Sequence, residues 1–175
     1  GGDPITAEAV VIATDGPGAA RLLDLPDPGS RSTCCVWFSA DAPPTGVGRL
    51  IALDGGAGPA RNVAVLSAVA PTYAPDGRAL VAASVPGTTG GPDLEGALRR
   101  QLGEWFGPAV AGWETLRVDR IDHGPPDQRA PLHARRAVDL GDGRYVCGDP
   151  RDTASIQGAL FSGRRTAEAI LAARA

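Results

Sequence analysis

The sequence predicts an α+β protein, in which an antiparallel sheet with flanking helices is accompanied by a terminal strand–helix unit. Between residues 33 and 85, apolar runs rich in Val and Leu alternate with turns rich in Pro, Gly and Asp, which is typical of successive antiparallel strands. Residues 93–106 have the apolar spacing of an amphipathic helix. Residues 145–171 contain a short apolar strand, a polar turn and a second helical pattern.

The chain begins with a strand–turn–helix pattern. Residues 9–14 form a continuous apolar run, which predicts a buried strand in a parallel pairing. Asp15 is a candidate N-cap, and Pro17 fits the first turn of a short helix that ends near Leu23. Residues 24–32 are rich in Pro, Asp and Gly and therefore predict a linker.

Five segments are predicted to form the strands of the sheet. The first four are apolar and separated by short turns, whereas the last alternates apolar with polar residues and fits a half-exposed position. They are residues 33–40, 48–53, 62–69, 78–85 and 113–121.

The helix at 93–106 is predicted to begin after Asp93 and to stop at Gly107. Trp105 and Phe106 fall on its inner face, where they either pack in the core or line a pocket. The whole inner face consists of Leu94, Ala97, Leu98, Gln101, Leu102, Trp105 and Phe106.

The C-terminal stretch places an acidic residue between a strand and a helix. Residues 145–147 predict the strand, Gly148 and Asp149 follow it, and a helix begins near Ser155, where Thr153 or Ser155 can cap the first turn. The predicted apolar face of this helix consists of Ile156, Ala159, Leu160, Gly163, Ala167, Ile170 and Leu171.

Two interpretations of this stretch remain open from spacing alone. A helix N-terminus that points into a crevice can hold an anion or an electron-rich ring, because free N–H groups and the positive end of the helix dipole face the ligand. Asp149 could then accept hydrogen bonds from ligand hydroxyls. The alternative is an ordinary strand–helix unit that packs a core.

The residues of this stretch resemble a known flavin motif. Residues 145–149 (YVCGD), 153–160 (TASIQGAL) and 162–167 (SGRRTA) look like the C-terminal motif of the FAD-dependent amine oxidoreductase superfamily. That superfamily includes flavin amine oxidases, protoporphyrinogen oxidases and phytoene-desaturase-like enzymes. Residues 9–23 (AVVIATDGPGAARLL) are similar to the segment where the chain leaves the FAD domain.

The resemblance implies a domain organisation. Residues 1–24 and 140–175 would be part of a Rossmann-like FAD-binding domain, and residues 25–139 would be a substrate-binding domain. No G-x-G-x-x-G opens a strand–helix unit, and the glycine-rich stretch at 86–91 lacks the required spacing. We therefore expect a C-terminal fragment, whose missing N-terminal segment binds the ADP half of FAD. Strands without neighbours would also favour self-association.

The resemblance also implies a role for individual residues. Asp149 would bond the ribityl chain of FAD, and Gly148 would let the backbone approach the cofactor. Ser155 is also expected to belong to the cofactor-binding site. The backbone amides of Ile156, Gln157 and Ala159 would face the pyrimidine end of the isoalloxazine. There the helix dipole would stabilise negative charge on the reduced flavin.

The implied reaction is hydride transfer from a C–N or C–C bond of a small-molecule substrate to the flavin. Many flavin amine oxidases use a lysine of the substrate domain near the flavin, but all 17 basic residues here are arginines. That difference favours the desaturase-like and protoporphyrinogen-oxidase-like branches, and the catalytic residues are unknown. We expect this chain alone to be inactive. The alternative is a non-catalytic module that binds a ligand or a protein.

Composition excludes other classes of function. A net charge of −3 argues against nucleic acid as a partner. No apolar run approaches a membrane span, and no signal peptide is present, which favours the cytoplasm. The three cysteines are expected to be small buried hydrophobes in a reducing compartment, and no metal site is expected.

The long loop at 122–136 contains the remaining candidate polar groups. His123 and His133 could act in proton transfer, but solvent-exposed loop histidines are the simpler interpretation. Arg135 and Arg136 could pair with a substrate carboxylate or simply form a solvated basic turn.

Overall fold

The computed structural model describes residues 2–74, 76–87, 93–132 and 135–174, and the chain divides into two compact units. The terminal unit consists of residues 1–31 and 123–175, and the central unit consists of residues 32–122. The segments 25–31 and 123–139, which the sequence assigned to the substrate-binding domain, thus belong to the terminal unit. Their assignment to a cofactor or a substrate domain stays a prediction.

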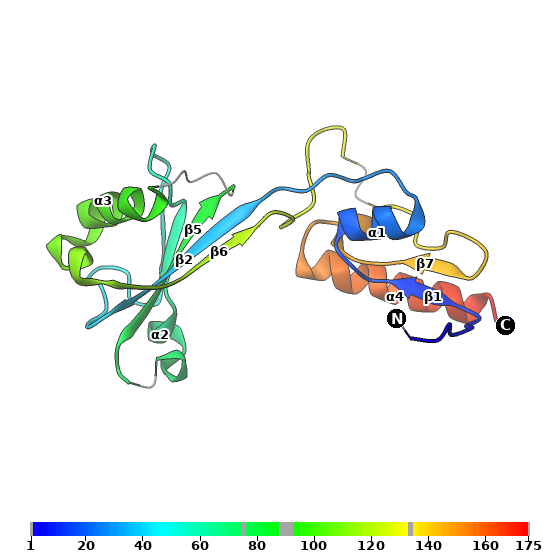
Figure 1. Ribbon diagram of the computed structural model, residues 1–175, viewed down its shortest axis with the longest axis horizontal. Helices are drawn as coiled ribbons and strands as arrows, with labels where there is room; N and C mark the ends of the chain where they lie inside the picture. Colours follow the sequence, from blue (N-terminus) through cyan, green and yellow to red (C-terminus); the bar gives the residue numbers. More distant parts are fainter. Residues whose placement is uncertain (1, 75, 88–92, 133–134, 175) are drawn as a thin grey trace. The chain divides into compact units, whose positions relative to one another are not determined.

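The central unit contains a five-stranded sheet in which every neighbouring pair is antiparallel (Figure 1). The strand order is β3-β4-β5-β2-β6, so β2 lies between β5 and the edge strand β6. This confirms the predicted α+β class. The bounds are β2 Thr33–Ala40, β3 Ile51–Leu53, β4 Asn62–Val65, β5 Ala79–Pro86 and β6 Glu114–Ile121.

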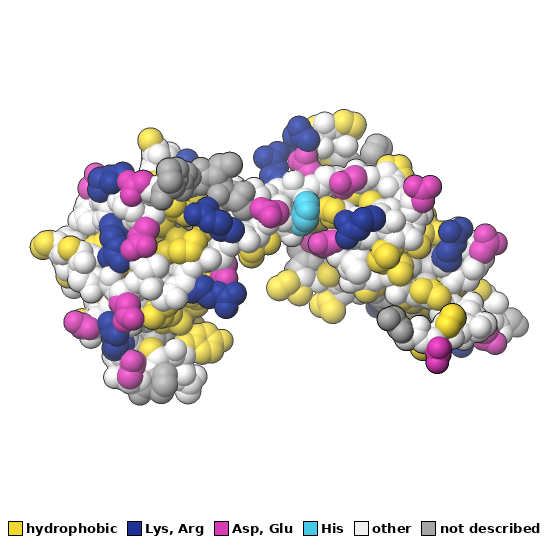
Figure 2. Space-filling model, in the orientation of Figure 1, with side chains coloured by type: hydrophobic (Ala, Val, Ile, Leu, Met, Phe, Trp, Pro, Cys, Tyr) yellow, Lys and Arg dark blue, Asp and Glu magenta, His cyan; other side chains and the backbone are white. Residues whose placement is uncertain are grey.

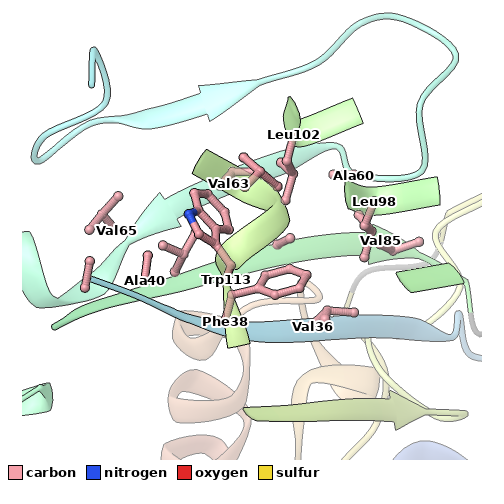
Figure 3. Packing of buried hydrophobic residues seen from close by; sticks show 14 of the residues in the cluster. Val36, Phe38, Ala40, Ala60, Val63, Val65, Val85, Leu98, Leu102 and Trp113 are labelled. Carbon is pink, nitrogen blue, oxygen red and sulfur yellow. The ribbon is translucent and has the colours of Figure 1, made fainter. Parts of the chain in front are cut away.

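The core lies between one face of this sheet and helix α3, Leu94–Phe106 (Figure 3). Strand alternation explains the pattern, since every second residue of β2 and β5 is buried on this face. The Phe38 and Trp113 rings pack at 5.8 Å between centroids. The helix contributes three leucines, and the sheet contributes small and β-branched residues: Leu94, Leu98, Leu102, Val36, Val63, Val65, Val81, Ala83 and Val85.

The ends of α3 differ in part from their prediction. Asp93 precedes the helix but does not cap it, because its carboxylate pairs with Arg100 at 3.2 Å. Gly107 ends the helix with φ +80°, as expected of a glycine stop. Trp105 and Phe106 are partly buried against the core, and Phe106 also lines a hollow, so both predicted roles are represented. A short 3₁₀ helix, η2 Pro108–Gly112, then leads to β6.

The predicted strand at 62–69 is wrong in its second half. Pairing with β5 ends at Val65, and Leu66–Val69 form one helical turn, α2, followed by the 3₁₀ helix η1, Pro71–Tyr73. The Ser67 hydroxyl accepts a hydrogen bond from the Leu80 amide at 3.0 Å. A side chain therefore satisfies a backbone donor of β5 where β4 turns away. The strand predicted at 48–53 is also shorter, since β3 begins at Ile51.

The terminal unit combines a two-stranded parallel sheet with three helical segments. Strand β1, Val10–Ile12, pairs in parallel with β7, Arg144–Val146. Asp15 caps α1, Gly16–Leu23, by accepting from the Gly18 amide at 2.7 Å, as predicted. The 3₁₀ helix η3, Asp149–Arg151, and helix α4, Ile156–Ala172, follow β7.

Strand β1 is parallel as predicted, but the prediction that it is buried is wrong. Val10 and Val11 are 49% and 41% exposed. Among the described residues β1 pairs with β7 alone, so its apolar side chains lack the layers that normally cover a parallel sheet.

Helix α4 buries a different face from the predicted one. Its buried residues are Gly158, Ser162 and Thr166, whereas Ile156 and Leu160 are 80% and 69% exposed. Thr166 lies close to β7, and its hydroxyl donates to the carbonyl of Ser162 at 2.9 Å. Small residues permit this close approach of the helix to the strand, so the larger apolar side chains lie on the opposite side.

Charges of both signs are interspersed on the visible surface of each unit (Figure 2). Arginines lie beside acidic side chains on this face of both units. In the part of the chain that the structure describes, no helix is both long and apolar enough to cross a membrane.

Candidate functional site

The turn after β7 depends on a glycine. Gly148 has φ +128°, in the region that favours glycine, and an added Cβ would lie 3.2 Å from the Pro150 ring. The Arg151 amide donates to the Gly148 carbonyl at 3.0 Å, which closes η3 directly after this glycine. Backbone conformation thus brings Asp149 to the carboxyl end of the strand.

Of the two predicted caps of helix α4, Ser155 is the one that the structure shows. The Ser155 hydroxyl accepts from the Gly158 amide at 3.0 Å and lies 3.1 Å from the Thr153 hydroxyl. Gly158 is required here, because an added Cβ would lie only 1.8 Å from the Thr153 carbonyl oxygen. The backbone of Thr153 therefore lies directly against the first turn of α4 at Gly158.

Two of the three predicted amides are available to a ligand. The N–H groups of Ile156 and Gln157 have no acceptor among the described residues. The Ala159 amide donates to the Ser155 carbonyl at 3.0 Å and is used within the helix. The free amides and the helix dipole make this end of α4 suited to a group with partial negative charge.

Asp149 is half-buried beside this helix start. Burial raises the pKa of its carboxyl group. No other side chain of the described residues hydrogen-bonds this carboxyl group, and it lines a hollow together with Pro28, Pro126 and Thr153. A partly buried acceptor without a side-chain partner is suited to ligand hydroxyl groups.

Residues that the sequence analysis did not single out hold this turn in place. Ser162 is fully buried, and its hydroxyl accepts from the Gly148 amide at 2.9 Å. Arg165 pairs with Asp152 at 2.9 Å and donates to the Arg151 carbonyl at 3.2 Å. Their only sequence signal was their place in the 162–167 motif, which gave them no role.

Among the loop candidates, Arg136 lines the same hollow as Asp149. His123 is exposed, and its Nδ1 lies 2.8 Å from the Ser30 hydroxyl. His133 lies outside the described residues. Arg135 is exposed, and the Arg136 carbonyl accepts a hydrogen bond from Arg165.

The prediction that all three cysteines are buried is confirmed for Cys34 and is wrong for the other two. The side chain of Cys34 is buried, whereas those of Cys35 and Cys147 are only partly buried. Burial raises the pKa of Cys35 to about 11, so its thiol is protonated near neutral pH. Among the residues described, no cluster of three His, Cys, Asp or Glu side chains is suited to a metal ion.

A second candidate surface is the face of the central sheet that points away from α3. Directly paired residues point to the same face, so the register defines two rows that cross all five strands. The Trp37 indole donates to the Asp119 carboxylate at 2.8 Å, and Arg117 also pairs with Asp119. The first row consists of Ile51, Ala64, Ala82, Trp37 and Arg117. The second row, next to it, consists of Leu53, Asn62, Ser84, Cys35 and Asp119.

Comparison with known proteins gives a family match over nearly the whole chain. The model of the flavin containing amine oxidoreductase family matches residues 1–171. No curated protein matches. The PF1083 protein from Pyrococcus furiosus has a similar fold, with a TM-score of 0.63 and 13% identity over 94% of this chain and 41% of that one. An oxidoreductase from Methanosarcina mazei has a TM-score of 0.48 and 16% identity, over 80% of this chain and 34% of that one. The chain thus spans well under half of either structure.

Proposed function

The chain belongs to the flavin-containing amine oxidoreductase family, and we propose that it is the C-terminal portion of an FAD-dependent oxidoreductase. The proposed reaction is oxidation of a C–N or C–C bond by hydride transfer. The observation that most supports it is the turn after β7, which carries the partly buried Asp149 carboxyl group and contacts helix α4, whose first amides are free. These donors and acceptors fit the polar groups of a flavin.

Each residue of the turn has a proposed task toward the cofactor. FAD, when bound, supplies the hydride acceptor. Asp149 accepts hydrogen bonds from its ribityl hydroxyls, and Gly148 keeps the backbone close to it. The amides of Ile156 and Gln157 donate toward the pyrimidine end, where the dipole of α4 stabilises negative charge. Ser155 keeps this helix end fixed by capping it.

The central unit is proposed to bind the substrate on the sheet face that points away from α3. Alanines lie at the middle of one row, so a flat apolar molecule can approach the sheet between Ile51 and Trp37. The absence of lysine supports a desaturase-like or protoporphyrinogen-oxidase-like enzyme. The ADP half of FAD would be bound by a segment that these 175 residues do not contain, since they include no G-x-G-x-x-G unit.

Flavin binding tests this proposal. The 175-residue chain is titrated with FAD and with riboflavin, and binding is followed by quenching of flavin fluorescence. We expect Asp149→Asn to weaken binding of both ligands by about tenfold, because the loss of one hydrogen bond to a charged group costs about 1.5 kcal/mol. The equally conservative control is Asp142→Asn, at an exposed turn residue with φ +53°.

The outcomes distinguish the two functions under consideration. Equal affinities of wild type and Asp149→Asn would contradict a flavin role for this turn. A folded chain that binds neither FAD nor riboflavin would favour the non-catalytic module. Binding of FAD no tighter than that of riboflavin is expected, because the ADP half finds no site in this chain.

Self-association of this chain is a second expectation. Leu160 and Phe161 of α4 are 69% and 58% exposed, and β1 exposes two valines. Apolar side chains that other layers would normally cover favour association. At tens of micromolar, light scattering should detect dimers or larger species, and Leu160→Glu should reduce them. Leu50→Glu, at an exposed leucine of the central unit, should not. A monodisperse wild-type monomer would contradict this expectation.

A further inference from the structure

Helix α4 contacts the turn at residues 148–152 at both of its ends. Ser162 and Arg165 are three residues apart, so they lie on neighbouring turns of one helix face. Ser162 contacts the beginning of the turn, and Arg165 contacts its end. Asp149 lies between these two contacts.

Ser162 engages both backbone groups of Gly148. Its hydroxyl accepts from the Gly148 amide at 2.9 Å and lies 2.8 Å from the Gly148 carbonyl oxygen. The same hydroxyl is 2.9 Å from the Ala159 carbonyl, so its single proton has two possible acceptors. Since Ser162 is fully buried, water cannot replace these bonds.

Arg165 holds the other end of the turn through both terminal nitrogens of its guanidinium group. One nitrogen, Nη1, lies 2.9 Å from the Asp152 carboxylate and 3.2 Å from the Arg151 carbonyl. The other, Nη2, donates to the Arg136 carbonyl, which ties in the loop before β7. Both side chains of the ion pair are only 19% exposed, so solvent screens it less than a surface pair.

We propose that Ser162 and Arg165 are positioning residues, which hold the turn at both ends so that the Asp149 carboxyl group stays in one place for a ligand hydroxyl. This inference rests on the proposed flavin site. It predicts that the geometry of Asp149 is determined from α4, through residues that do not contact the cofactor. A turn with one free end would spread Asp149 over several positions, and ligand binding would then have to order it again.

The test compares Ser162→Ala, Arg165→Gln and the double variant with a control on the same helix. Arg164→Gln is that control, because Arg164 is 73% exposed and its ion pair is with Glu168, one turn away on the same helix. Two measurements need no flavin. These are amide hydrogen exchange at Arg151 and Asp152, and an NMR titration of the Asp149 carboxyl group. The third is FAD affinity.

Each single variant should speed exchange at Arg151 and Asp152 and lower the pKa of Asp149 toward its ordinary value, because a loosened turn admits water. FAD binding should weaken about tenfold, as is typical when residues that support a binding group are lost. The double variant should lose less than the product of the two single effects, since both act on one turn. Arg164→Gln should match wild type in all three measurements.

Three results would overturn the inference or its premise. Unchanged exchange and an unchanged Asp149 pKa in both single variants would show that the turn holds its shape without these contacts. Faster exchange with unchanged FAD affinity would show that the turn does not serve the ligand. A wild-type chain without FAD binding would overturn the proposed function, while the two flavin-free measurements still test the contacts. If Ser162→Ala fails to fold, Asp152→Asn removes only the ion pair and should give a smaller change in the same direction.

Discussion

Alanine at Gly158 is expected to disrupt the start of α4, whereas alanine at Gly163 of the same helix is expected to stabilise it. A Cβ at position 158 would lie 1.8 Å from the Thr153 carbonyl oxygen and 2.8 Å from its hydroxyl, so the chain must move. At position 163 an added Cβ meets nothing within 4 Å. Alanine there gains about 0.5–1 kcal/mol over glycine in a helix.

The cost at Gly158 should reach about 3 kcal/mol or more, because the clash is with backbone and not with the end of a flexible side chain. Helical circular dichroism during urea unfolding measures both units. Tryptophan fluorescence measures the central unit alone, since all three tryptophans, at 37, 105 and 113, lie there. Gly158→Ala should therefore change the unfolding curve measured by circular dichroism and leave the midpoint measured by tryptophan fluorescence unaltered.

Flavin titration completes this comparison. Gly158→Ala should also lose flavin affinity, because the free amides of Ile156 and Gln157 belong to the disrupted turn. Gly163→Ala should retain it. Equal stability of the two variants, or wild-type affinity in Gly158→Ala, would mean that the close contact with Thr153 is not needed for the fold or the site.

Regular elements were predictable where one face of an element meets a continuous core. Strand β2 has the bounds predicted from sequence, and α3 buries the leucines that its spacing selected. Periodicity was sufficient there because strand alternation and the helical repeat determine which residues face a single packing layer.

Helix α4 illustrates where that reasoning fails. Its apolar residues predicted an inward face, but close contact with β7 requires small side chains, and Gly158, Ser162 and Thr166 supply them. A hydrophobic periodicity does not indicate which of two faces a neighbouring strand approaches. The turn into α2 was missed for a similar reason, because the Ser67 hydroxyl bonds the Leu80 amide from 13 residues away.

The candidate site was predictable in its local part only. The place of Asp149 after a strand and the Ser155 cap follow from the order of residues along the chain. The contacts of Arg165 with the carbonyls of Arg151 and Arg136 do not, since they join residues 14 and 29 positions apart. A carbonyl group has no sequence signal, because every residue contributes one.

Arg99 is expected to contribute most of any single charged residue to the stability of the central unit. Its guanidinium donates to the carbonyls of Val110 at 3.0 Å and Trp113 at 2.7 Å, and lies 5.3 Å from the centre of the Phe38 ring. It also contacts the Thr115 hydroxyl, so α3 is tied to η2 and β6 through one side chain. These contacts connect segments that the sheet hydrogen bonds do not connect.

Arg99→Met should lower the free energy of unfolding by about 2–4 kcal/mol, because methionine keeps the apolar stem but removes one donor from each of the two carbonyls and the ion pair with Glu95. Arg100→Met is the control, since Arg100 is 69% exposed and pairs with the exposed Asp93. Its effect should stay within about 0.5 kcal/mol. Arg99→Lys should recover only part of the loss, because one ammonium group cannot occupy the positions of a planar fork.

Urea unfolding followed by tryptophan fluorescence measures these differences directly, since Trp113 and the Phe38 ring adjoin the guanidinium. Equal effects at positions 99 and 100 would mean that the carbonyls of η2 find other donors or water once the arginine is gone. Full recovery by lysine would assign the effect to charge alone. A large loss at Arg99 that lysine restores only in part would instead assign it to the geometry of the fork, and it would identify α3 as the element that holds η2 and the edge strand β6 in place.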